Sequence, residues 1–539
     1  MLHRRDFLRK SAAGAGVILF SRTPALADSA ADSRIEILLD EPLGTINPNM
    51  YGHFTEHLGG VIYDGVWVGP NSKVPNVDGI RKDLVDHMRK IKAPVIRYPG
   101  GCFADSYDWR DGVGPAEKRP RRSNFWGGTE ANQFGTDEFV HFCKLVGSQP
   151  YLAANVRSLP AAEFYRWVEY CNSPAKSTTL ADMRAAAGSA DPYNVRYWGV
   201  GNESWGCGGN FTPQEYAVEF RRFATWVPDF NKDLAFIASG PSDFSWDWTR
   251  GFLEEIIRKG PGQINSIYGL ALHYYTWNLS RGRTKDWDAG KGDALKFDPV
   301  DWYELLSEGQ VIESLINGHW QVMEEFDHDH HIKLIIDEWG PWYRPGSEQT
   351  KGNILEQTPT LRDAVFSAMT LDIFHQHPEK IAMANCAQLI NCLNSLYLAH
   401  EDKFCITPVG HVFDMYAAHQ GAQSLRTIFS TPEIHYDRDS KQASFAGLKG
   451  SASLRDKDLV LTVTNPHVSE PREATIAIRG ASIQSATATV LSHTDLHAHN
   501  SLDQKNVLVP QSNDLTLKGK NSTHIFAPAS VTKLTMRLT

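Results

Sequence analysis

Eight short apolar segments alternate with amphipathic stretches of helical period through most of the chain. The apolar segments span residues 49–54, 94–98, 150–155, 195–200, 234–239, 268–274, 333–337 and 381–388, and the helical stretches span 80–91, 136–145, 160–170, 213–226, 248–259, 310–326 and 361–374. Strands that alternate with helices favour a parallel sheet covered by those helices, and eight such strands favour its closed form. We therefore predict an α/β fold, a (β/α)8 TIM barrel over residues 49–418.

The pattern changes after residue 418. Segments 459–464, 475–478, 486–491 and 534–538 alternate apolar and polar residues, with Gly, Pro and Asn-Asp turns between them and no helical period. This pattern predicts a C-terminal all-β sandwich domain over residues 419–539. A strand-like segment at 34–39 precedes the barrel, so the N-terminal segment 28–48 is a candidate to join the sandwich. Two domains agree with a length of 539 residues, because single cores stop growing at roughly 250–300 residues.

The first 27 residues have the composition of a targeting segment. Arg4 and Arg5 open a charged stretch, residues 12–20 are apolar, and Ala25-Leu26-Ala27 fits a cleavage site. This segment resembles a twin-arginine-type signal peptide and predicts an exported protein, periplasmic or extracellular. The apolar stretch is shorter than the roughly 20 residues that cross a bilayer, so we expect no membrane span after signal removal.

Charge and cysteine content narrow the class of protein. A net charge of −9 and a pI near 6.2 argue against a nucleic-acid partner, since such proteins normally carry a basic face. Seven cysteines, at positions 102, 143, 171, 207, 386, 392 and 405, are odd in number and widely scattered. They do not form a disulfide framework, and we predict mostly buried free thiols with at most one bridge.

Two glutamates stand where predicted strands end. Glu203 follows the fourth strand within RYWGVGNESWGCGG at 196–209, and Glu338 ends the seventh within KLIIDEWG at 333–340. Strand ends at the C-terminal face of a barrel hold side chains rigidly and leave them reachable. One such glutamate is a weak signal, but two in matching contexts indicate the carboxylate pair of a glycosidase.

Five motifs are spread along the chain: YGHFTEHLG at 51–59, RYPGGCF at 97–103, WGVGNESWG at 198–206, DEWG at 337–340 and ANCAQLI at 384–390. Together they resemble the motifs of the α-L-arabinofuranosidases of glycoside hydrolase family 51. The resemblance covers essentially the whole chain after residue 27. It implies a retaining mechanism on a barrel with a C-terminal β-sandwich, a homo-oligomer, often a hexamer, and neither a cofactor nor a metal.

The resemblance also assigns the site residues. It implies that Glu203 is the acid/base, that Glu338 is the nucleophile, and that Asn202 binds the sugar 2-hydroxyl. The remaining substrate-binding positions that it implies are Glu56 and Gln388 on sugar hydroxyls, Arg97 beside the nucleophile, His273 and Tyr275 at the end of the sixth strand, and Cys102 in the pocket lining. Many relatives carry Asn at the last position, so we expect Cys102 to act as a weak hydrogen-bond donor.

These site residues are compatible with three functions. The leading one is release of terminal non-reducing α-L-arabinofuranosyl residues from arabinan, arabinoxylan or arabino-oligosaccharides. An endo-β-1,4-glucanase or xylanase could use the same carboxylate pair, but it would need an open groove in place of a pocket, and the segment 277–299 could wall off one side. A non-catalytic carbohydrate-binding protein is disfavoured because both glutamates are present.

Overall fold

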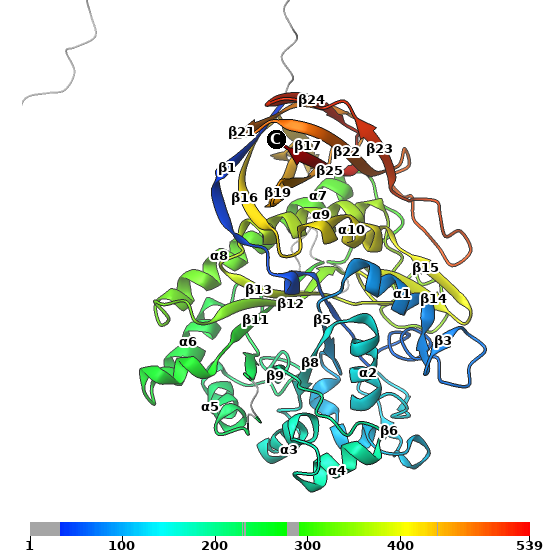
Figure 1. Cartoon of the computed structure of the whole chain (residues 1–539), viewed down its shortest axis with the longest axis vertical. Coiled ribbons are helices and arrows are strands. Elements are labelled where there is room, and N and C mark those ends of the chain that lie inside the picture. Colours follow the sequence, from blue (N-terminus) through cyan, green and yellow to red (C-terminus); the bar gives the residue numbers. More distant parts are fainter. Residues whose placement is uncertain (1–32, 229, 231–232, 278–289, 439) are drawn as a thin grey trace, which may run out of the picture.

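The computed structural model describes residues 33–228, 230, 233–277, 290–438 and 440–539 (Figure 1). The signal peptide predicted over residues 1–27 lies outside the described residues, as do the start of the 28–48 segment and the middle of the 277–299 segment.

Eight parallel strands close into a barrel, which confirms the predicted (β/α)8 fold. In order around the ring they are β2 (Gly52–Phe54), β5 (Val95–Tyr98), β8 (Gln149–Ala154), β9 (Tyr197–Val200), β10 (Ala235–Ala238), β11 (Gly269–Thr276), β12 (Lys333–Pro341) and β13 (Ile381–Cys386). Because the strands follow the ring in chain order and all point the same way, every strand end faces one mouth.

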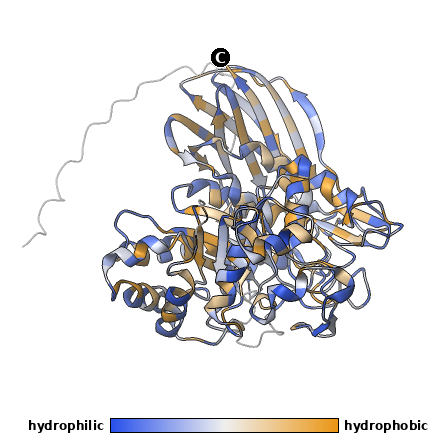
Figure 2. Cartoon of the chain, turned by 60° about the horizontal axis from the view of Figure 1, so that its bottom comes forward, coloured by the Kyte–Doolittle hydropathy of each residue, from blue (hydrophilic) through white to orange (hydrophobic). Residues whose placement is uncertain are grey.

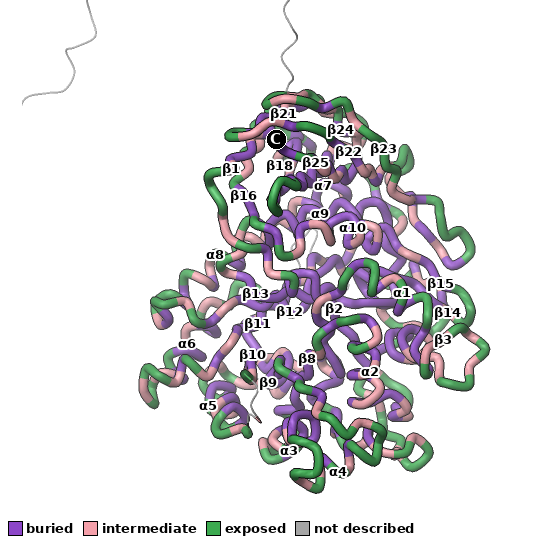
Figure 3. Tube along the Cα trace, viewed as in Figure 1, coloured by how far each residue is buried: buried purple, intermediate pink, exposed green. Residues whose placement is uncertain are grey.

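Helices surround this barrel. They are α1 (Lys82–Ile91), α2 (Thr136–Val146), α3 (Ala161–Asn172), α4 (Thr179–Ala186), α5 (Pro213–Ala224), α6 (Trp246–Ile257), α7 (Pro299–Gly309), α8 (Val311–Glu324), α9 (Leu361–Gln376) and α10 (Pro408–Tyr416). The sequence pattern did not reveal α4, α7 or α10. Helix α10 spans only 9 residues, too few to show a helical period that differs from a short apolar segment. Figure 3 shows the buried strands inside and the exposed outer faces of the helices.

The second domain is a nine-stranded sheet. Its strands, in spatial order, are β23 (Gln511–Leu515), β22 (Ile483–Ser492), β25 (Ser530–Leu538), β20 (Asp458–Asn465), β19 (Lys449–Arg455), β16 (Gln423–Ser430), β1 (Ser33–Thr45), β21 (Arg472–Arg479) and β24 (Asn521–Phe526). The sheet curls so that β24 contacts β20 across a shared apolar core. Its alternation of apolar and polar residues is visible in Figure 2. The predicted C-terminal β-domain is thus confirmed, as one continuous curled sheet.

Strand β1 belongs to this sheet although it precedes the barrel in sequence. It pairs antiparallel with β16 and parallel with β21. Short two-stranded pairs complete the described strands: β3 (Asn76–Val77) with β4 (Ile80–Arg81), β6 (Arg122–Ser123) with β7 (Thr129–Glu130), β14 (Tyr397–His400) with β15 (Lys403–Ile406), and β17 (Glu433–Arg438) with β18 (Lys441–Ala446). Strand β4 occupies the first turn of the helix predicted at 80–91.

Helix α9 joins the two domains, because it lies between the barrel and the curled sheet and is buried almost all round (Figure 1). Its Asp372 is fully buried and accepts hydrogen bonds from Ser451 Oγ, Thr462 Oγ1 and Tyr416 Oη at 2.7, 2.8 and 3.0 Å. Burial raises the pKa of Asp372 to about 7, although these donors act in the opposite direction. None of the helices in the described part of the chain is long and apolar enough to cross a bilayer.

Candidate active site

Glu203 and Glu338 meet at the mouth of the barrel. Glu338 lies near the end of β12, and Glu203 lies in the loop that follows β9. A carboxylate oxygen of one lies within 4.8 Å of a carboxylate oxygen of the other, and His273 Nδ1 lies within the same distance of both. Retaining glycosidases hold their two carboxyl groups about 5–5.5 Å apart, whereas inverting enzymes need about 6.5–9.5 Å. The separation therefore suits a double displacement.

The loop that carries Glu203 is tightly folded. Glu203 has a left-handed backbone with φ of 38°, which is uncommon for a residue with a Cβ. Its carbonyl oxygen accepts hydrogen bonds from the N–H groups of Gly206 and Gly208 at 2.7 and 3.1 Å. A Cβ at Gly208 would lie 1.7 Å from the Asn202 carbonyl oxygen, so only glycine fits there. The glycines of this segment therefore fix the direction in which the Glu203 side chain points.

Glu338 is held in its ionised form. Arg97 Nη1 donates to Oε1 at 2.7 Å, and Tyr275 Oη donates to Oε2 at 2.7 Å. Burial acts to raise the pKa of Glu338, but the charges of His273 and Arg97 and the two hydrogen bonds outweigh it and lower the pKa below its ordinary value. A buried carboxylate that stays ionised is suited to act as a nucleophile.

His273 links the two glutamates. Its Nδ1 lies 3.1 Å from Glu203 Oε1 and 3.6 Å from Glu338 Oε2. Burial acts to lower the pKa of His273, but the charge of Glu338 and the hydrogen bond and charge of Glu203 raise it above its ordinary value. A bulge between Leu272 and His273 brings the ring level with Glu338 on the neighbouring strand.

The other predicted site residues surround a cavity beside the two glutamates. Glu56 accepts hydrogen bonds from Gln388 Nε2 at 3.0 Å and from Trp126 Nε1 at 2.8 Å. Burial and the charge of Glu338 raise the pKa of Glu56 to about 7. Arg97 Nη2 donates to Asn202 Oδ1 at 2.5 Å. The cavity between these groups is lined by Glu56, Leu58, Gly101, Cys102, Trp126, Asn202, Glu203, Tyr275, Glu338, Trp342, Leu355, Gln388 and Leu393. Of the predicted residues, Arg97 and His273 lie behind this lining and hold the carboxylates.

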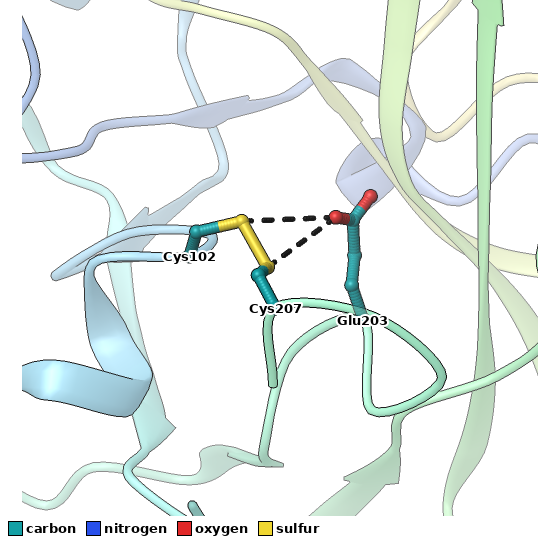
Figure 4. Close-up of side chains that lie close together, drawn as sticks. All are labelled: Cys102, Glu203 and Cys207. Atoms are coloured by element: carbon teal, nitrogen blue, oxygen red, sulfur yellow. Dashed lines mark hydrogen bonds between the residues drawn. A yellow bond between two sulfur atoms is a disulfide. The ribbon is translucent and has the colours of Figure 1, made fainter. Parts of the chain in front are cut away.

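Cys102 requires a correction. It forms a disulfide with Cys207, so it has no S–H group and cannot be the weak donor that we predicted. The two Sγ atoms lie 3.8 and 3.5 Å from Glu203 Oε2 (Figure 4). The sequence separation of 105 gave no sign of this pairing, because it depends on how the loops after β5 and β9 cross. The remaining five cysteines are free and buried, as predicted.

Two contributors were not found from the sequence. Trp126, in the turn between β6 and β7, covers one side of the cavity and donates to Glu56. Asp105 is fully buried, and its carboxylate accepts backbone hydrogen bonds from Val156 at 2.8 Å, Arg157 at 3.2 Å and Asn202 at 3.1 Å. Burial raises the pKa of Asp105 to about 7. This residue ties together the loops after β5, β8 and β9, and a lone Asp in a loop carries no sequence signal for that task.

Two groups of three side chains have metal-ligand geometry within the described residues. They are Cys102, Glu203 and Cys207, and Glu203, His273 and Glu338. His57, which follows Glu56, belongs to neither group. Both of its ring nitrogens are already in hydrogen bonds: Nδ1 lies 2.8 Å from Glu130 Oε2, and Nε2 lies 3.0 Å from Tyr98 Oη.

The barrel and the close carboxylate pair at its mouth define a glycoside hydrolase with retaining geometry. Residues 87–290 match the family model of the alpha-L-arabinofuranosidase 1 domain, and residues 337–530 match that of the alpha-L-arabinofuranosidase C-terminal domain. An intracellular exo-alpha-L-arabinofuranosidase of Bacteroides ovatus is 36% identical over 479 residues, which is 88% of this chain and 90% of the relative.

Solved structures of arabinofuranosidases are also similar to this chain. The GH51 arabinofuranosidase of Xanthomonas axonopodis pv. citri has a TM-score of 0.87 and 34% identity, covering 94% of this chain and 100% of that one. The arabinose complex of the Thermotoga maritima alpha-L-arabinofuranosidase has a TM-score of 0.81 and 28% identity, with coverage of 94% and 100%. The chain belongs to the α-L-arabinofuranosidases of glycoside hydrolase family 51.

The comparison corrects the expected location. The Bacteroides ovatus relative is named an intracellular enzyme, which contradicts our expectation of an exported protein, periplasmic or extracellular. The expectation rested on paired arginines before a short apolar stretch, and such a pattern in a short segment is too weak to establish export.

Proposed function

We propose that this enzyme releases terminal non-reducing α-L-arabinofuranosyl residues from arabinan, arabinoxylan or arabino-oligosaccharides, with Glu338 as nucleophile and Glu203 as acid/base. The observation that carries the assignment is the approach of the two carboxylates to within 4.8 Å, with one of them held by Arg97 and Tyr275. Of the two glutamates, Glu338 is the one whose oxygens accept hydrogen bonds from both a guanidinium, that of Arg97, and a hydroxyl, that of Tyr275. We therefore assign the nucleophile to Glu338.

In the first step, a Glu338 oxygen attacks the anomeric carbon and forms an ester bond. The bond from this carbon to the leaving oxygen breaks, and Glu203 gives its proton to that oxygen. Arg97 and Tyr275 orient the attacking carboxylate. His273 Nδ1, which is 3.1 Å from Glu203 Oε1, fixes the direction of the acid.

In the second step, ionised Glu203 takes a proton from water while the water oxygen attacks the anomeric carbon. The ester bond to Glu338 breaks, and the two inversions give net retention. The charge balance supports the exchange of roles: once Glu338 is esterified, its negative charge no longer opposes ionisation of Glu203.

Asn202, Glu56 and Gln388 hold the sugar in this proposal. Arg97 occupies the Asn202 amide oxygen, and one Asn202 amide N–H points to Cys207 Sγ at 3.8 Å, which leaves the other N–H to the sugar 2-hydroxyl. The carboxyl of Glu56 is anchored by Gln388, by Trp126 and by the backbone N–H of Phe103 at 3.0 Å. A carboxyl fixed on several sides is suited to select among hydroxyl positions.

Substrate preference is the direct test. The enzyme should hydrolyse 4-nitrophenyl α-L-arabinofuranoside and release monomeric arabinose from arabinan, with little action on carboxymethylcellulose. Activity on carboxymethylcellulose alone would reject the proposal in favour of the endo-β-1,4-glucanase alternative, which the comparisons do not favour.

We also propose a homo-oligomer in which residues 49–418 form the catalytic domain and residues 419–539, joined by the strand of the 28–48 segment, form the supporting domain. The family resemblance supports the oligomer, and the pairing of β1 with β16 supports the domain division. Light scattering should give a mass of at least twice that of the 60.3 kDa chain. A monomer mass would contradict the oligomer.

A further inference from the structure

The Cys102–Cys207 disulfide lies beside the acid/base and is accessible from the cavity. Cys102 lines the cavity, and both cysteines are half-buried, whereas the free cysteines of the described residues are buried. Figure 4 shows that the two sulfur atoms and Glu203 Oε2 face one another. A small reductant or an ion that enters the sugar cavity therefore reaches this pair and none of the buried thiols.

The two sulfur–oxygen distances match those of a zinc site. Zinc binds thiolate sulfur at about 2.3 Å and carboxylate oxygen at about 2.0–2.2 Å in a tetrahedron, which puts a sulfur and an oxygen ligand about 3.6 Å apart. The observed distances to Glu203 Oε2 are 3.8 Å from Cys102 Sγ and 3.5 Å from Cys207 Sγ. The two sulfur atoms are bonded to each other, so they can bind zinc only after this bond is reduced.

We propose that the Cys102–Cys207 disulfide masks an inhibitory zinc site, which forms from the thiolates of Cys102 and Cys207 and the carboxylate of Glu203 once the bond is reduced. A dithiol supplies two electrons and two protons, becomes a cyclic disulfide, and leaves two protein thiols. A Zn²⁺ ion then displaces both thiol protons and the carboxyl proton of Glu203 into solvent, and binds the two thiolates and the Glu203 carboxylate. Water completes the tetrahedron.

The effect on catalysis rests on the proposed function of Glu203. A carboxylate bound to zinc can neither donate a proton to the leaving oxygen nor take one from water. The reduced enzyme with zinc is therefore inactive, and the oxidised enzyme is protected because its sulfur atoms cannot bind as thiolates. Oxidation state and zinc together would set the activity.

The test compares oxidised and reduced enzyme. One portion is treated with dithiothreitol and desalted without oxygen, and the other is only desalted. Both receive Cd²⁺, whose thiolate complexes absorb in the ultraviolet, and, in separate samples, ZnCl₂ followed by an assay of 4-nitrophenyl α-L-arabinofuranoside hydrolysis. We expect about one cadmium bound through thiolates per reduced chain and none per oxidised chain. We expect zinc to lower the rate of the reduced enzyme at least about tenfold, with recovery after a chelator.

Three variants make the result specific, each assayed relative to its own zinc-free rate. The double variant Cys102→Ser/Cys207→Ser should lose both the absorbance and the inhibition. Cys207→Ser alone should lose most of the cadmium affinity. Cys405→Ala, which removes a buried free thiol from β15, should respond to zinc like the parent enzyme.

Equal metal binding by the oxidised and reduced forms, or metal binding that persists in the double variant, would overturn the proposal. Thiolate absorbance without inhibition would reject zinc as an inhibitor. The assignment of Glu203 is tested separately by azide rescue, which needs no metal, so the two failures can be told apart.

Discussion

Tyr275 Oη donates a hydrogen bond to Glu338 Oε2 at 2.7 Å, on the oxygen opposite to the one that Arg97 binds. The two donors come from β11 and β5, on either side of the barrel mouth. They fix the orientation of Glu338, the proposed nucleophile, and favour its ionised form, and each can be removed without touching the other.

Tyr275→Phe should lower kcat/KM about 10- to 100-fold, because one buried donor to a charged group is lost. The hydrogen bond from Tyr275 helps to lower the pKa of Glu338, so without it that pKa rises. The acid limb of the kcat/KM profile should therefore move to higher pH. Tyr274→Phe is the matched control, since the Tyr274 hydroxyl bonds the Glu308 carbonyl at 2.8 Å and not the nucleophile. An unchanged acid limb in Tyr275→Phe would show that this hydroxyl does not tune the nucleophile.

Removal of the two glutamates should have different effects. Glu338→Ala should leave no detectable turnover, because no other carboxylate can form the ester intermediate. Glu203→Ala should lose about 10²–10⁴-fold on arabino-oligosaccharides and much less on a 4-nitrophenyl substrate, whose leaving group needs little protonation. Azide should restore turnover of Glu203→Ala as arabinofuranosyl azide of retained configuration, measured by NMR. Formation of the retained azide by Glu338→Ala, with the inverted azide from Glu203→Ala, would exchange the two roles.

Gly101→Ala should weaken sugar binding. A Cβ at this position would lie 3.1 Å from Glu338 Oε1 and 3.4 Å from Glu56 Oε2, between the proposed nucleophile and a proposed sugar-binding group. We expect KM to rise about tenfold with a small change in Tm, since an added methyl group costs about 1–3 kcal/mol in a filled site. Gly262→Ala, where a Cβ meets open space, is the control. An unchanged KM for Gly101→Ala would place the sugar elsewhere in the cavity.

Asp372 should make the stability of the enzyme depend on pH. Its pKa is raised by burial to about 7 in the folded protein, compared with about 3.9 in an unfolded chain. The stability from its protonated form is therefore complete below about pH 4. It is lost as the pH rises through about 7. The parent Tm should fall from pH 5 to pH 8, and Asp372→Asn, which cannot ionise, should fall less, by a few degrees.

Calorimetry across this pH range checks the prediction for Asp372. The control is Asp247→Asn on the exposed surface of α6. Glu56 and Asp105, whose pKa values are also about 7, leave part of the slope in every variant. Equal slopes for the parent and Asp372→Asn would contradict the prediction.

Much of the fold followed from local patterns. The eight barrel strands were found because each is a short apolar segment between helical stretches. The helix predicted over 136–145 corresponds to α2, which ends one residue later at Val146, before the left-handed Gly147. Helix α10 was missed because its 9 residues are too few to show a helical period, whereas the longer α9 was found although it is buried almost all round. The single curled sheet was not distinguished from two packed sheets, since its strands alternate in the same way in both.

The sequence by itself determined the barrel, the β-domain and the strand-end positions of Glu203 and Glu338, because hydrophobic period and turn residues act over short distances in the chain. The tertiary structure decided the disulfide between Cys102 and Cys207, the contact of Trp126 with Glu56, and the place of Asp105 beneath three loops. These contacts join residues 51 to 105 positions apart. Whether such residues meet depends on the packing of every element between them, which no local pattern records.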